Sequence, residues 1–145
     1  MAKSRSATRT PTTRAKKAPP KAKATATAPD PSREVALEIT RLSLDKKALD
    51  VVVLDVRGLA SYAEYFVLMT AESDPQLTAI ADYLDDQMKL KGQRPLGIEG
   101  TRAGRWVLID FGDVVAHVFY QDARTFYDLE GLWADAPRLA VVSAP

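Results

Sequence analysis

Cysteine is absent from this chain of 145 residues, and histidine occurs once, as His117. Without cysteine the chain has no disulfide, no thiolate metal site and no cysteine nucleophile. A single imidazole leaves no second one for histidine-based metal or nucleophilic chemistry. No apolar run approaches the length of a membrane-spanning helix, and no stretch resembles a secretory signal peptide. We therefore expect no cofactor, no metal and no membrane partner.

Acidic residues are missing from segment 1–29, which holds eight lysines and arginines among alanine, threonine, serine and proline. Of the 20 basic residues in the chain, 12 therefore remain after position 29, against 19 acidic residues, so that part carries a net charge of −7. Segment 1–29 has no apolar periodicity and is expected to be disordered. It is either a solvated tail or a sequence-independent arm for nucleic acid. The composition also resembles an organelle transit peptide, but its prolines and poor amphipathicity disfavour that interpretation.

Segment 104–120, GRWVLIDFGDVVAHVFY, predicts a β-hairpin. Two apolar runs, residues 105–111 and 114–119, flank Gly112-Asp113, and glycine adopts the positive φ of such a turn at little cost. The register of this hairpin predicts four facing pairs: Phe111 with Val114, Asp110 with Val115, Leu108 with His117, and Trp106 with Phe119.

Alternation along the two strands sorts their side chains onto two faces. The first face is wholly apolar and is expected to be core: Val107, Ile109, Phe111, Val114, Ala116 and Val118. The second face mixes large apolar groups with an acid and an imidazole: Trp106, Leu108, Asp110, Val115, His117 and Phe119. The second face is covered by the protein itself or is a place where a partner docks.

The other elements follow from periodicity and end signals. Helices are expected over residues 30–47, 73–91 and 123–130, and further strands over 50–56, 65–70 and 95–99. Strand 50–56 is expected to be covered on both faces. In the last helix Asp122 is the expected cap, and Phe126 and Leu129 are expected to point inward. The order predicts an α/β fold with a five-stranded mixed sheet flanked by helices, in a domain over residues 30–138. Residues 139–145 are expected to be frayed.

No catalytic constellation is evident in the sequence. The dinucleotide-binding, phosphate-loop, zinc-protease and serine-hydrolase motifs are absent. His117 is interpreted as a structural histidine, hydrogen-bonded across the sheet. The best enzymatic alternative is a Mg²⁺ site built from carboxylates, with Asp110 and Asp113 at the hairpin and Asp55 on a neighbouring strand. The acidic cluster in helix 73–91 is interpreted as a solvated face.

Two tryptophans remain as candidates for contact with a partner. Tryptophan supplies much of the binding energy at interface centres, although each of these residues is equally compatible with the core. Trp106 is the better candidate for exposure because its strand also carries Asp110, a carboxylate that is costly to bury alone.

Four blocks of the chain, in order and spacing, resemble the ribosomal silencing factor family, also called the Iojap-like family. These blocks are DVVVLDVRGLASYAEYFVLMTAESDPQ, RPLGIEG, GRWVLIDFGDVVAHVFYQDARTFYDLEGLW and DAP. The resemblance covers about residues 32–138 and leaves the basic tail outside.

The resemblance implies a small α/β protein whose mixed sheet is like a nucleotidyltransferase core without the catalytic motif. It also implies a ribosomal silencing factor that binds ribosomal protein fourteen of the large ribosomal subunit. Bound there, it would block joining of the small subunit and repress translation when nutrients are scarce. A role in large-subunit assembly, known for organellar relatives, is the alternative, with a metal-dependent nucleotide-handling enzyme a weaker one. Self-association of the free protein is also implied.

The site hypothesis places the contact on the second face of the hairpin. Trp106 is the expected apolar anchor and Asp110 the expected partner of a basic group, with Leu108 between them. Further candidates are Glu99 and His117 beside this face, and Tyr127 and Trp133, which either extend it or pack the last helix. The basic tail is expected to add contacts to ribosomal RNA. The bacterial cytoplasm is the favoured location, with organellar import as the alternative.

Overall fold

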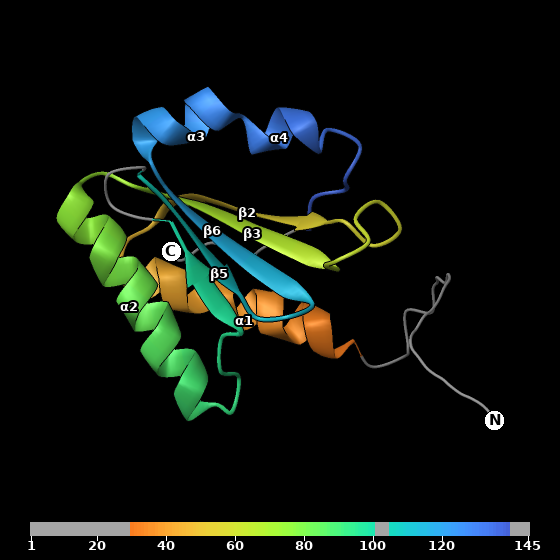
Figure 1. Ribbon diagram of the computed structural model, residues 1–145, viewed down its shortest axis with the longest axis horizontal. Helices are drawn as coiled ribbons and strands as arrows, with labels where there is room; N and C mark the ends of the chain where they lie inside the picture. The colour runs from red at the N-terminus through yellow and green to blue at the C-terminus, as the bar shows by residue number, and fades with distance from the viewer. Residues whose placement is uncertain (1–29, 101–104, 140–145) are drawn as a thin grey trace. The chain divides into compact units, whose positions relative to one another are not determined.

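Figure 1 shows a sheet with helices on both faces. This computed structural model describes residues 30–100 and 105–139. Along the chain the elements are α1 (Pro31–Asp45), β2 (Leu49–Asp55), β3 (Tyr65–Ala71), α2 (Asp74–Leu90), β4 (Gly97–Glu99), β5 (Trp106–Asp110), β6 (Val114–Tyr120), α3 (Gln121–Tyr127) and α4 (Leu129–Leu132). Helices α1 and α2 lie on one face of the sheet, and α3 and α4 lie on the other.

The five strands have the order β2-β3-β6-β5-β4. Strands β3 and β6 are parallel, whereas the other three pairs are antiparallel. The mixed sheet predicted from the sequence is therefore confirmed. The hairpin register is confirmed as well, since β5 and β6 pair Trp106 with Phe119 and Leu108 with His117. Gly112 sits in the turn with φ +96°, a conformation that favours glycine.

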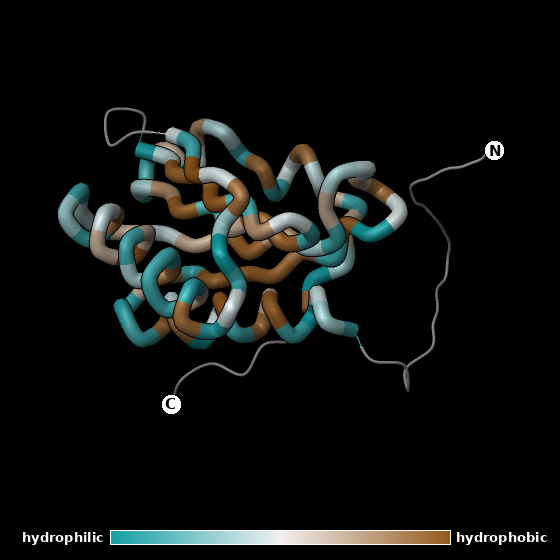
Figure 2. The backbone as a smooth tube through the Cα atoms, turned by 60° about the horizontal axis from the view of Figure 1, so that its bottom comes forward, coloured by the Kyte–Doolittle hydropathy of each residue, from teal (hydrophilic) through white to brown (hydrophobic). Residues whose placement is uncertain are grey.

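The predicted core face of the hairpin packs against α1 and α2. Its residues Val107, Ile109, Val114, Ala116 and Val118 are all buried in one cluster with apolar side chains of these two helices. Figure 2 shows the hydrophobic stretches of the backbone gathered in the middle of the fold. Each large apolar side chain buried here contributes about 1.5–3 kcal/mol. Of the two buried apolar clusters in the described residues, this one is the larger.

Local signals place α2 where the sequence predicted it. The Ser73 hydroxyl accepts a hydrogen bond from the Gln76 backbone N–H at 3.1 Å, so Ser73 caps the helix. Gly92 follows the helix with φ +81°. Leu77, Ile80, Leu84 and Met88, which recur at helical spacing, are all buried. Among the described residues, no helix has the length and apolar character needed to cross a bilayer.

The prediction of a single helix over residues 123–130 is wrong. The helix is interrupted at Asp128, which has φ +45° and separates α3 from α4. The Asp128 carboxylate accepts the Gly131 backbone N–H at 3.1 Å and so caps α4. Asp122 is not the cap of α3, since Tyr120 occupies that position without a side-chain hydrogen bond. Leu129 packs inward as predicted, but Phe126 is 80% exposed, because the break at Asp128 puts these two residues in different helices.

Strand β2 is less covered than predicted. It is an edge strand, and its first residues Leu49 and Asp50 are exposed. The register between β2 and β3 shifts between Leu49 and Val52, which marks a bulge. At the C-terminal end, the Leu139 N–H donates to the Val53 carbonyl at 2.9 Å, so this residue is paired and not frayed. The predictions for residues 1–29 and 140–145 lie outside the described residues.

Candidate partner-binding site

The second face of the hairpin is covered by the protein over most of its area. Phe119, Val115 and His117 are buried beneath α3 and α4, together with Phe66 of β3. Towards β5 the cover is incomplete, and Trp106, Leu108 and Asp110 stay half-buried. The protein itself therefore covers most of this face, and the part on β5 stays accessible as the candidate contact.

An aromatic strip runs from this half-buried region onto the outer side of α3. The Trp106 ring lies 5.1 Å from Phe119 and 4.7 Å from Tyr127, and Tyr127 lies 5.1 Å from Phe126. Tyr127 is 42% exposed and Phe126 80% exposed. We call the five residues Trp106, Leu108, Asp110, Phe126 and Tyr127 the Trp106 surface. Large aromatic side chains at the protein surface are typical of interface centres.

Trp106 is held from below by His117. Its indole N–H donates to His117 Nδ1 at 3.2 Å across the β5–β6 pair. The interpretation of His117 as a structural histidine hydrogen-bonded across the sheet is confirmed. With only 3% of its area exposed, His117 lies beneath the surface and supports Trp106 from inside. Because the indole N–H is already hydrogen-bonded to His117, the exposed part of the ring can contact a partner only through its apolar surface.

Burial keeps the His117 imidazole neutral. It lowers the pKa of this side chain from 6.5 to about 4. Because Nδ1 accepts the tryptophan N–H, the imidazole proton is assigned to Nε2. Nε2 is buried without a hydrogen-bond partner, and the Phe66 ring packs edge-on at 5.1 Å. Protonation would place a charge among aromatic rings, at a high energetic cost.

Two carboxylates lie at the rim of the aromatic strip, Asp110 within the Trp106 surface and Glu99 beside it. Asp110 is half-buried, and one of its oxygens accepts the Gly112 N–H at 2.8 Å, so this residue also stabilises the hairpin turn. Glu99 of β4 is exposed and pairs with Leu108 of β5, which puts both side chains on the same face of the sheet. The structure thus brings Glu99 and Asp110 to the rim of an apolar patch.

Trp133 does not join this surface. It is half-buried and packs edge-on against Phe66, with ring centroids 5.3 Å apart. Of the two roles considered for this residue, packing of the last helix describes the geometry. Phe126 is the surface residue that sequence reasoning missed. Helical spacing could not have found it, because the break at Asp128 puts Phe126 and Leu129 in different helices.

The carboxylate arrangement considered for metal-dependent chemistry is not formed. Asp55 lies on β2 and Asp110 on β5, with β3 and β6 between them. Asp55 is paired with Arg57 at 2.7 Å. Within residues 30–100 and 105–139, no three histidine, aspartate or glutamate side chains converge as a metal site would require.

Comparison with known proteins identifies the family. A family model described as "Ribosomal silencing factor during starvation" matches residues 29–144. The chain is 46% identical over 93 residues to "Ribosomal silencing factor RsfS" of Bacillus subtilis, covering 64% of this chain and 79% of that protein. It is 36% identical over 104 residues to "Protein Iojap, chloroplastic" of Arabidopsis thaliana, covering 72% of this chain but 43% of that protein.

A solved structure agrees with this assignment. The crystal structure of a protein from Bacillus halodurans superposes with a TM-score of 0.67 at 37% identity, covering 75% of this chain and 99% of that one. The α/β fold with a five-stranded mixed sheet, expected from the sequence, is confirmed. The chain belongs to the ribosomal silencing factor (Iojap) family, whose members are non-enzymatic, ribosome-binding regulators of translation.

Proposed function

We propose that this protein binds ribosomal protein fourteen of the large ribosomal subunit through the Trp106 surface and thereby blocks joining of the small subunit. Translation is repressed as a result, in keeping with the family description "during starvation". The observation that carries the proposal is the partly exposed aromatic strip of Trp106, Tyr127 and Phe126. Among the described residues, no group of side chains forms a metal site.

The strip has the composition of an interface centre. Three aromatic rings lie in sequence, and Trp106 is already fixed from below by His117. A side chain held in its bound orientation loses little entropy when the partner arrives. The partly exposed tryptophan is therefore the expected anchor, and the neighbouring rings exclude water around it.

Charge supports a basic partner. The chain after residue 29 carries a net charge of −7, and Asp110 and Glu99 lie at the rim of the aromatic strip. Complementary charge raises the rate of encounter and fixes orientation more than it adds affinity. A basic ribosomal protein would meet this rim with favourable potential. The blocking step needs only occupancy and bulk at the subunit contact.

Assembly of the large subunit is the second candidate. It is favoured by one comparison, since "Mitochondrial assembly of ribosomal large subunit protein 1" of Mus musculus is 32% identical over 98 residues, covering 66% of this chain and 43% of that protein. An assembly factor would associate with immature large-subunit particles, and its deletion would leave such particles accumulating. A silencing factor would instead act on mature subunits.

The blocking activity predicts a specific sedimentation result. Purified subunits are mixed under joining conditions, with and without the protein, and separated on a sucrose gradient. We expect the protein to migrate with the large subunit and the peak of joined ribosomes to fall. Comigration without any fall in joined ribosomes would contradict blocking and favour assembly. Absence from the large-subunit fractions at low salt would contradict both candidates.

The basic tail predicts a salt effect on binding. Segment 1–29 holds eight basic and no acidic residues, and each basic residue bound to ribosomal RNA releases a counterion. We expect affinity for the large subunit to fall more steeply with salt for the full chain than for a variant that starts at Asp30. Affinity is measured by cosedimentation across a salt series. Equal slopes for both proteins would show that the tail makes no such contact.

A further inference from the structure

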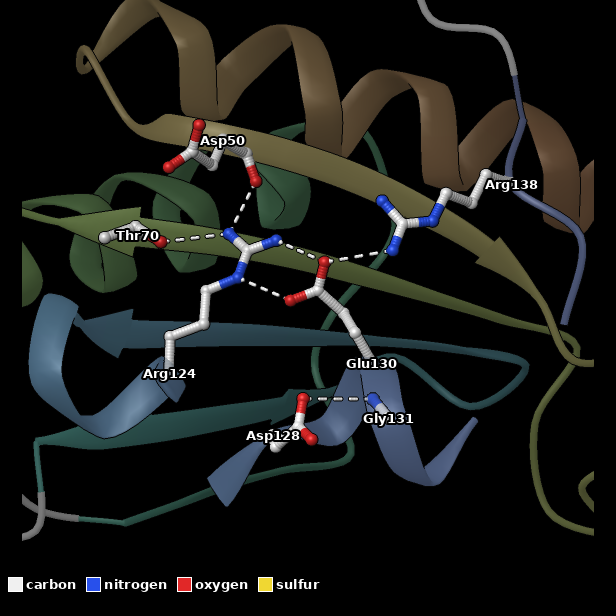
Figure 3. Close-up of polar contacts among 7 residues, drawn as sticks. All are labelled: Asp50, Thr70, Arg124, Asp128, Glu130, Gly131 and Arg138. Atoms are coloured by element: carbon white, nitrogen blue, oxygen red, sulfur yellow. Dashed lines mark hydrogen bonds and ion pairs between the residues drawn. The ribbon is translucent and has the colours of Figure 1, made fainter. Parts of the chain in front are cut away.

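The Arg124 guanidinium donates four hydrogen bonds, away from the Trp106 surface. Figure 3 shows its guanidinium reaching from α3 towards β2, β3 and α4. Nε and Nη2 donate to the two oxygens of Glu130 at 3.0 and 3.1 Å, a bidentate pair. Nη1 donates to the Thr70 hydroxyl at 2.9 Å and to the Asp50 carbonyl at 2.5 Å.

Three features of the fold surround this contact. The bulge in β2 gives Asp50 a φ of +49°, and its carbonyl accepts a hydrogen bond from Arg124. The break at Asp128 starts α4, which carries Glu130 back towards α3. Arg138 then contacts the same Glu130 carboxylate at 3.4 Å. A single guanidinium thus ties together β2, β3, α3 and α4.

Helix α3 has little stability of its own. It has seven residues, lacks a side-chain cap, and buries only Ala123. A helix this short is not stable by itself in water. The Arg124 side chain is only 12% exposed, so its hydrogen bonds are shielded from competing water. Glu130 is held in its charged form, since the hydrogen bond from Arg124 lowers the pKa of its carboxyl.

The same helix carries Tyr127, whose ring lies 4.7 Å from Trp106 of β5. Arg124 reaches β2 and β3, towards one edge of the sheet, while Tyr127 contacts β5, towards the other edge. We propose that Arg124 is a positioning residue of the partner-binding surface: by fixing α3 to β2 and β3, it holds Tyr127 against Trp106. This inference rests on the proposed function of the Trp106 surface.

The test uses Arg124→Met and Arg124→Lys, each alone and combined with Tyr127→Ala. Lysine keeps the charge but cannot form the bidentate pair, so it provides a second, milder variant. Arg57→Met is the matched control, since Arg57 also pairs with a carboxylate, that of Asp55 at 2.7 Å. Affinity for purified large subunits is measured by cosedimentation at a temperature where circular dichroism shows every variant folded.

Positioning predicts a non-additive result. We expect Arg124→Met to weaken binding about tenfold, and Arg124→Lys less, with little further loss when Tyr127→Ala is already present. Arg57→Met should bind like the parent protein. In nuclear magnetic resonance spectra, contacts between the Tyr127 and Trp106 rings should weaken in Arg124→Met and persist in Arg57→Met.

Two results would overturn the inference. One is unchanged affinity of both Arg124 variants with intact ring contacts, which would leave Arg124 with a stabilising role only. The other is that Arg124→Met lowers the affinity by the same factor in the Tyr127→Ala variant as in the parent protein. Failure of the proposed function is recognised separately, because Trp106→Ala would then bind normally whatever the Arg124 variants do. The ring contacts are measured on the free protein and do not depend on the ribosome.

Discussion

Replacing Trp106 with alanine is expected to weaken binding to the large ribosomal subunit about a hundredfold, the loss of about 2.7 kcal/mol typical of an aromatic anchor. The reason is that Trp106 lies at the centre of the Trp106 surface, in contact with Tyr127 above and His117 below. Affinity is measured by cosedimentation with purified subunits, and inhibition of subunit joining should weaken in parallel. Circular dichroism and the melting temperature establish that the variant is folded.

Tyr62→Ala is the matched control for this substitution. Tyr62 is an aromatic residue with 64% exposure in the connection between β2 and β3, and the ring it contacts is Phe66, at 5.9 Å. Its loss should leave subunit affinity unchanged. Asp110→Asn then separates charge from shape, because asparagine retains the acceptor for the Gly112 N–H but loses the negative charge. Normal affinity of a folded Trp106→Ala variant would remove this surface from consideration.

Acidification is expected to lower the free energy of unfolding by about 3 kcal/mol between pH 6.5 and pH 4 through His117 alone. Burial lowers the pKa of this residue in the folded protein from 6.5 to about 4. In that window the unfolded chain binds a proton that the folded chain does not, so stability is complete above pH 6.5 and falls as the pH drops. His117 is the one histidine of the chain, which makes the signal specific.

Urea denaturation at several pH values measures this effect. The slope should approach about 1.4 kcal/mol per pH unit between pH 6 and 5, above the range where most carboxyl groups titrate. His117→Asn keeps an acceptor for the Trp106 indole N–H but does not titrate, so its slope should be nearly flat whatever its absolute stability. Equal slopes in the two proteins would contradict the assignment of a buried neutral imidazole.

The hairpin shows why much of this fold follows from sequence. Strand alternation and the Gly112-Asp113 turn determine register locally, so the pairing of Trp106 with Phe119 could be predicted without the rest of the chain. Capping of α2 by Ser73 is equally local. The break at Asp128 was not predictable in this way. It depends on a left-handed residue whose carboxylate caps the next helix, and helical periodicity does not signal that geometry.

The candidate site was predictable in part. The register of the strands puts four predicted site residues on one face of the sheet, where the structure has them together: Trp106, Leu108, Asp110 and Glu99. Phe126 was predicted to point inward with Leu129, since a continuous helix puts residues three apart on one face, but the break at Asp128 separates them and Phe126 is exposed. The Arg124 contacts join residues 54 and 74 positions apart in the sequence, and a bulge positions one of the acceptors. No local pattern reveals such a contact.

Site-specific photo-crosslinking tests the central claim most directly. Phe126 is 80% exposed beside Tyr127, so p-benzoylphenylalanine at this position should leave the fold intact and face the partner. The same group at Tyr62 is the control. After irradiation with purified large subunits, we predict a crosslink from position 126 to ribosomal protein fourteen and none to that protein from position 62. A crosslink to ribosomal protein fourteen from position 62 alone would contradict the proposed surface.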